Sequence, residues 1–87
     1  MSAQDKLPEP SFEVLLQVLS GPCFVHLGLV PNPETGATTK DLTQAKWCLD
    51  LLHVFEEKTR ASATNEERQM LDGLLHELRS VYLKFSS

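Results

Sequence analysis

Two prolines in the middle of the chain separate it into two unlike halves. Pro31 and Pro33 each fix a backbone φ angle and bias the preceding residue toward an extended conformation, so a helix cannot continue through this segment. Residues 32–35, which are followed by Gly36, fit a type I turn. A tight turn requires proline, asparagine and glycine for backbone reasons, so it explains these residues better than a ligand-binding loop does. We call residues 27–36 the elbow and expect separate helices on either side of it.

Before the elbow, the sequence predicts a short polar arm and then one apolar helix. Residues 1–10 contain two prolines and no periodic pattern, which predicts a flexible N-terminal arm. The helix is predicted over residues 12–28, with Ser11 as its N-cap. Its only polar stripe is the narrow one formed by Glu13 and Gln17, so the helix must be covered on more than one side.

The apolar helix contains two residues that disfavour a regular helix, Gly21 and Pro22. Proline cannot donate the backbone hydrogen bond of a helix interior, and its ring crowds the preceding turn. The helix is therefore either kinked at this point, or it ends and restarts with Pro22 in the first turn. Gly28 is the expected C-terminal cap.

After the elbow, two amphipathic helices are predicted, over residues 42–59 and 65–84. Asp41 with Gln44, and Thr64 with Glu67, have the spacing of capping boxes at the two helix starts. The short connection between the helices favours an antiparallel hairpin. The sequence therefore predicts an all-α fold of three helices, in which an apolar, kinked first helix packs on a helical hairpin within a single domain over residues 11–87.

Charge and hydropathy exclude several classes of function. Twelve acidic and eight basic residues give a net charge of −4, and the basic residues are scattered rather than clustered, so we expect no nucleic-acid partner. The apolar segment over 12–30 is interrupted by polar residues, glycine and proline, which argues against a membrane span. The N-terminus lacks the basic region of a signal peptide, so we expect a cytoplasmic protein with reduced cysteines.

Two cysteine–histidine pairs are the only candidates for metal or thiol chemistry. Cys23 and His26 lie three residues apart, and Cys48 and His53 lie five apart. Five residues correspond to about 140° of net rotation on a helix, so the second pair diverges. The first pair lies in the most apolar segment, where a thiol pKa rises rather than falls. We therefore expect no metal, no cofactor and no catalytic residue.

Several runs of sequence carry a resemblance to a known family. They are residues 28–36, Asp41-Leu42, Ala45-Lys46, Leu52, residues 55–59, Leu74-Leu75 and Leu78-Arg79. With these runs, the chain from Ser11 to about Tyr82 resembles the bacterial family catalogued as domain of unknown function 1844. The resemblance implies a small, soluble, helical bacterial protein, and it supplies no activity and no catalytic or ligand residues.

The excess apolar surface of the first helix predicts protein–protein contact. Our main hypothesis is a non-enzymatic module that forms a homo-oligomer, with a dimer favoured and the first helix buried between chains. An adaptor for a different protein partner is the alternative, and a thiol- or metal-dependent enzyme using Cys23, His26 or Cys48 is the third hypothesis. Trp47 is either an interface anchor or an ordinary core residue. The interface candidates are Phe12, Leu15, Leu16, Leu19, Phe24 and Trp47.

Overall fold

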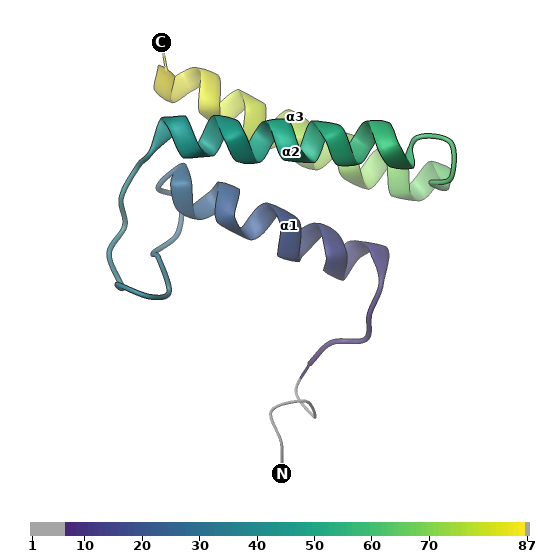
Figure 1. Ribbon diagram of the computed structural model, residues 1–87, viewed down its shortest axis with the longest axis horizontal. Coiled ribbons are helices and arrows are strands. Elements are labelled where there is room, and N and C mark those ends of the chain that lie inside the picture. Colours follow the sequence, from purple (N-terminus) through teal and green to yellow (C-terminus); the bar gives the residue numbers. More distant parts are fainter. Residues whose placement is uncertain (1–6, 87) are drawn as a thin grey trace.

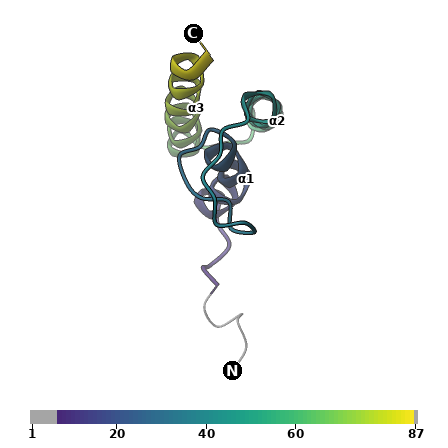
Figure 2. The same ribbon diagram turned by 90° about the vertical axis from the view of Figure 1, so that its left-hand side faces the viewer.

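The computed structural model describes residues 7–86, which form three α-helices and, over that range, no strand. Helix α1 spans Phe12–His26, α2 spans Leu42–Thr59 and α3 spans Asn65–Ser86. Figure 1 shows α2 and α3 running in opposite directions as a hairpin, with α1 antiparallel to α2. In Figure 2, α2 is seen nearly end-on with α3 beside it, and α1 lies below the pair. The predicted all-α fold of three helices is confirmed.

All three helices contribute to one hydrophobic core. Helix α3 supplies Leu71, Leu75 and Leu78, which repeat at the i, i+4, i+7 spacing of one helix face. At the start of α1 the core is extended by Phe12, whose ring stacks on Phe55 of α2 with centroids 5.7 Å apart. The other buried hydrophobic residues are Leu16, Cys23, Leu27, Ala45, Cys48, Leu49 and Leu52.

The first two helices begin at the N-caps that the sequence predicts. The Ser11 hydroxyl accepts a hydrogen bond of 3.1 Å from the backbone N–H of Val14. The Asp41 carboxylate accepts one of 3.1 Å from the backbone N–H of Gln44, and a second from that residue's side-chain amide. Each cap satisfies a backbone donor that the first helical turn leaves free, and both predictions are confirmed.

The hairpin turn is held by a reciprocal capping box and by an arginine. The Thr64 hydroxyl accepts from the Glu67 N–H at 3.1 Å, while the Glu67 carboxylate accepts from the Thr64 N–H at 2.9 Å. Arg68 donates across the turn to the backbone carbonyl of Arg60 at 3.1 Å. These contacts fix the start of α3 against the end of α2, and the predicted capping box is confirmed.

Helix α1 ends at His26, two residues before the end that the sequence predicts. Gly28 has a φ of 75°, a left-handed conformation in which the helix cannot continue. Its N–H donates to the Val25 carbonyl, and the Leu29 N–H donates to the Phe24 carbonyl, both at 3.0 Å. This pair of bonds is a Schellman motif, so Gly28 follows the helix instead of belonging to it. At the other end of the chain, α3 continues two residues beyond its predicted end.

Helix α1 passes through Pro22 without a break, which excludes the predicted alternative of a restart at this residue. Pro22 and Val18, whose carbonyl loses its backbone donor, are both exposed. The freed carbonyl therefore lies on the solvent side of the helix, where water can satisfy it. The predicted kink stays a prediction.

The elbow is closed by its own hydrogen bonds. The Asn32 carboxamide oxygen accepts from the Glu34 N–H at 2.8 Å, and the Asn32 backbone bonds to Gly36 and Ala37. Beyond the elbow, the chain returns to α1, where the Asp41 N–H donates to the His26 carbonyl at 2.7 Å. The start of α2 is thereby tied to the end of α1.

The remaining expectations for the fold concern the arm and the membrane. Residues 7–10 of the predicted arm are exposed and outside any helix, and the rest of the arm lies outside the described residues, so its flexibility stays a prediction. Among the described residues, no helix has the length and apolar character needed to cross a bilayer.

Candidate docking groove

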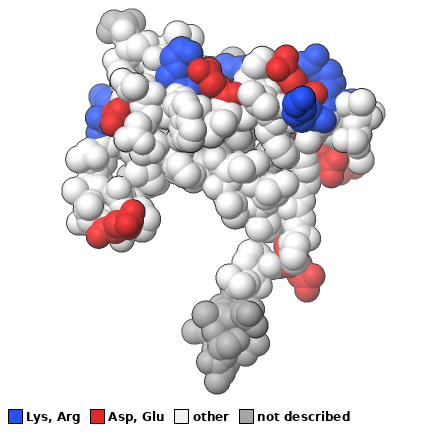
Figure 3. All heavy atoms as spheres, in the orientation of Figure 1, with Lys and Arg blue, Asp and Glu red and all other residues white. Residues whose placement is uncertain are grey.

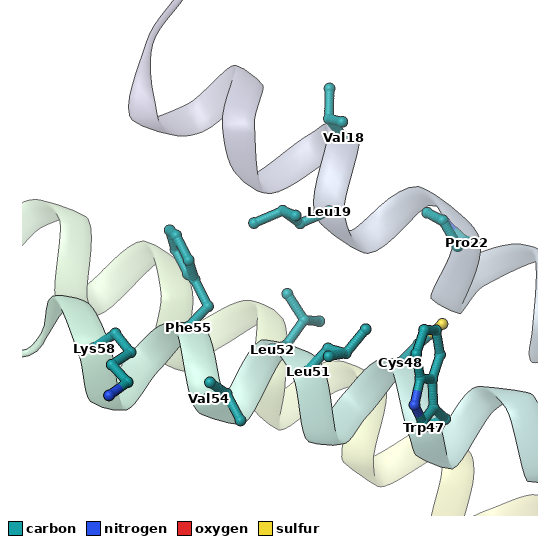
Figure 4. A pocket seen from close by; sticks show the side chains of 10 residues that line it. All are labelled: Val18, Leu19, Pro22, Trp47, Cys48, Leu51, Leu52, Val54, Phe55 and Lys58. Atoms are coloured by element: carbon teal, nitrogen blue, oxygen red, sulfur yellow. The ribbon is translucent and has the colours of Figure 1, made fainter.

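An apolar groove of about 470 Å³ runs between α1 and α2. In Figure 4, Leu19 of α1 and Leu52 and Phe55 of α2 lie between the two helices, while Val18 and Val54 project from the outer sides of α1 and α2. Lys58, at one end, is the only charged residue among the ten that line it. The others are Val18, Leu19, Pro22, Trp47, Cys48, Leu51, Leu52, Val54 and Phe55.

Large hydrophobic side chains on both rims of the groove are open to solvent. On the α1 side, Val18 is 66% exposed and Leu19 is 38% exposed. On the α2 side, Trp47 is 62% exposed, and Leu51 and Val54 are each 48% exposed. Isolated exposed hydrophobic residues are common, but a contiguous apolar patch is typical of an interaction surface.

The rims arise because the apolar faces of α1 and α2 are wider than the area that the core covers. On α2, the core residues Cys48, Leu52 and Phe55 are each preceded in sequence by an apolar residue, which are Trp47, Leu51 and Val54. One residue corresponds to about 100° of rotation, so this second stripe lies beside the core face of α2. It forms the α2 rim of the groove.

The structure divides the six interface candidates into two groups. Leu15, Leu19 and Trp47 are exposed and available to a partner. Leu16, at 3% exposure, belongs to the core of the single chain, and Phe12 and Phe24 are partly buried against that core. For Trp47, exposure of this size favours the interface alternative over core packing.

Of the five exposed hydrophobic residues on the rims of the groove, three were missing from the predicted interface set: Val18, Leu51 and Val54. The signal that could have identified them is their spacing with the predicted candidates. Leu15, Val18 and Leu19 fall at i, i+3, i+4 on α1, while Trp47, Leu51 and Val54 fall at i, i+4, i+7 on α2. Each set is an apolar stripe in addition to the stripe that enters the core.

The two cysteines are buried free thiols. Burial raises the pKa of Cys23 to about 12, and the neighbouring thiol of Cys48 contributes to this increase. A thiol with such a pKa remains protonated at neutral pH, and the thiolate is the form that attacks electrophiles or binds metal ions. Cys23 is therefore poorly suited to both roles.

His53 does not converge with Cys48. His53 lies on the exposed surface, where its ring is 3.4 Å from the Glu56 carboxylate and 3.7 Å from the Glu57 carboxylate. Arg79 approaches the same ring at 3.3 Å. Cys48, in contrast, faces the core, as the rotation between positions 48 and 53 predicts. Within residues 7–86, no three histidine, cysteine or acidic side chains are grouped so that they could hold a metal ion.

Apart from Lys58, the charged side chains lie outside the groove. In Figure 3, the blue and red residues lie mainly along the hairpin and at the ends of the molecule, while the centre of this face, over α1, is white. The net charge of −4 is therefore not concentrated where a partner would meet the groove. Association at the groove would bury little like charge.

Comparison with known proteins identifies the family. The model of the family described as a domain of unknown function (DUF1844) matches residues 9–84, which is most of the chain. The chain belongs to this family. The DUF1844 match includes all of α1 and α2, and therefore every residue that lines the groove. No curated protein and no solved structure gives a significant match.

Proposed function

We propose that this DUF1844 protein is a non-enzymatic protein-interaction module that self-associates through the groove between α1 and α2. The observation that carries the proposal is the pair of exposed apolar rims, which includes a tryptophan. Tryptophan is enriched among the residues that dominate interface energetics. Burial of apolar area in a partner would contribute about 25 cal/mol for each Å² removed from water.

The environment of the polar groups supports a non-enzymatic role. Cys23 is held in its protonated form by burial, and His53 is engaged with exposed carboxylates and an arginine. In the elbow, the polar side chains of Asn32 and Thr35 accept hydrogen bonds from the backbone of the same loop. These groups are used for the structure of the chain itself, which disfavours the hypothesis of a thiol- or metal-dependent enzyme.

An adaptor for a different protein is the second candidate, and the shape of the groove is the observation that favours it. Two helices with an apolar channel between them form the surface on which an amphipathic helix docks. Such a partner would need an apolar stripe of its own. A second copy of this chain already carries two such stripes, on α1 and on α2.

Analytical ultracentrifugation of Leu51→Lys tests the proposal. Wild-type protein is expected to sediment as a dimer at micromolar concentration, and Leu51→Lys as a folded monomer, because the substitution places a charge in the groove. Leu83→Lys is the matched control, since this leucine is exposed on α3 and away from the groove. A wild-type protein that is a compact monomer over this concentration range would contradict self-association.

A further inference from the structure

We infer that the groove faces the groove of a second copy in an antiparallel, two-fold arrangement, in which each rim packs against the same rim of the other copy and Trp47 of each copy lies against Lys58 of the other. This inference rests on the proposed self-association and adds the identity of the contacting surfaces, their direction and their register. It is derived from the spacing of the two rims and from the position of the one charge.

The residues of the α2 rim have the same spacing when they are read from either end of the helix. Trp47, Leu51, Val54 and Lys58 line the groove, and successive members are four, three and four residues apart. Two antiparallel copies of this stripe, centred between Leu51 and Val54, bring each Leu51 opposite a Val54. The same register brings each Trp47 opposite a Lys58. A closed two-fold dimer requires this kind of self-complementary surface.

The α1 rim has the same property. On α1, Val18, Leu19 and Pro22 line the groove, and the exposed Leu15 extends the same stripe beyond it. The four residues are spaced three, one and three apart, so this stripe is also symmetric about its centre. Figure 4 shows Leu19, next to that centre, facing Leu52 across the groove. The centres of the two stripes therefore lie at similar levels of the groove, and one two-fold axis can relate both pairs of helices.

The charge in the groove favours the antiparallel direction. A parallel pairing of the α2 stripes would place two Lys58 ammonium groups next to each other in apolar surroundings, which is unfavourable. The antiparallel pairing instead places each ammonium group over an indole ring, the aromatic ring that attracts a cation most strongly. Within residues 7–86, Lys58 makes no ion pair, so its head group is available for this contact.

Cysteine cross-linking measures the direction of pairing. In the antiparallel dimer, the two copies of residue 54 are offset by about 4.5 Å along the helix and the two copies of residue 58 by about 16 Å. Val54→Cys should cross-link with a thiol reagent whose span is much shorter than the larger offset, and Lys58→Cys should not. Wild type is the control, because its own two cysteines are buried.

Fluorescence of Trp47, the only tryptophan, measures whether the groove is covered. Its emission should shift to shorter wavelength as protein concentration rises through the dissociation constant. Lys58→Glu should raise that constant at least about tenfold, from loss of the cation–ring contact. Lys58→Arg should restore it, whereas Lys46→Glu, the same charge change outside the groove on the same helix, should have little effect.

The outcomes separate this inference from the proposed function. Dimers that leave the Trp47 emission unchanged, or that cross-link through Lys58→Cys, would overturn the antiparallel arrangement and leave self-association standing. A monomer at all accessible concentrations would overturn both. A monomer whose Trp47 emission shifts only on addition of an amphipathic helical peptide would assign the groove to a different protein.

Discussion

At the scale of single residues, three glycines have clearly different environments. Gly28 has a φ of 75°, and a Cβ atom added to it would lie 3.3 Å from the Thr39 carbonyl oxygen. Gly36 has a φ of 74° but has open space around the Cβ position, as does the helical Gly73. A residue with a Cβ atom would therefore meet both backbone strain and a close contact at position 28, but only backbone strain at position 36.

Alanine substitutions at these glycines should therefore differ in sign. Gly28→Ala is expected to lower the free energy of unfolding by more than about 1 kcal/mol, and Gly36→Ala by a smaller amount. Gly73→Ala should raise it by about 0.5 to 1 kcal/mol, because alanine is the better helix former. Urea unfolding followed by circular dichroism measures all three. Equal effects at positions 28 and 73 would contradict this description of the end of α1.

At the scale of helices, the start of α2 depends on one carboxylate. Hydrogen bonds from the Gln44 backbone, and then from its side chain, lower the pKa of Asp41 below the ordinary value of 3.8. A carboxylate whose pKa is lower in the folded state stabilises that state above its unfolded pKa. This contribution is lost as the pH falls through the lower, folded pKa.

The stability of the wild-type protein should therefore contain an acid-sensitive component that Asp41→Asn lacks. The substitution keeps a side chain that can cap the helix but removes the titrating group. Urea midpoints at neutral pH and at a pH below 3.8 should differ less for Asp41→Asn than for wild type. Asp50→Asn, which removes the same charge from the middle of α2, is the control and should retain the wild-type difference.

Helix starts were predictable from the sequence, and the division of α1 into core and rim was not. The caps at Ser11, Asp41 and Thr64 depend on side chains that bond to their own helix three residues later, so the sequence contains the whole interaction. Leu15 and Leu16 are adjacent and chemically identical, but only Leu16 enters the core. Which of them does so depends on the rotation of α1 against the hairpin, a tertiary property that periodicity alone does not determine.

At the scale of the whole molecule, residues 7–86 form a thin body. Its principal extents are 39, 34 and 16 Å, and its radius of gyration of 14.3 Å exceeds the value of about 12 Å expected for a compact domain of this length. A thin body has a large surface for its volume, and two of its helices expose apolar stripes. Packing a second copy on the groove would thicken the molecule and cover those stripes, so folding and association should be linked.

This linkage predicts that stability depends on protein concentration. A partner that binds only the folded state stabilises it by mass action, so the urea midpoint of wild-type protein should rise as concentration increases. The midpoint of Leu51→Lys should be independent of concentration and should equal the wild-type midpoint extrapolated to high dilution. Leu83→Lys should retain the wild-type dependence.

Circular dichroism over a hundredfold range of concentration is sufficient, since each tenfold step changes the free energy of association by about 1.4 kcal/mol. A wild-type midpoint that does not change over that range would show that the exposed apolar stripes of α1 and α2 are stable in water without a second copy.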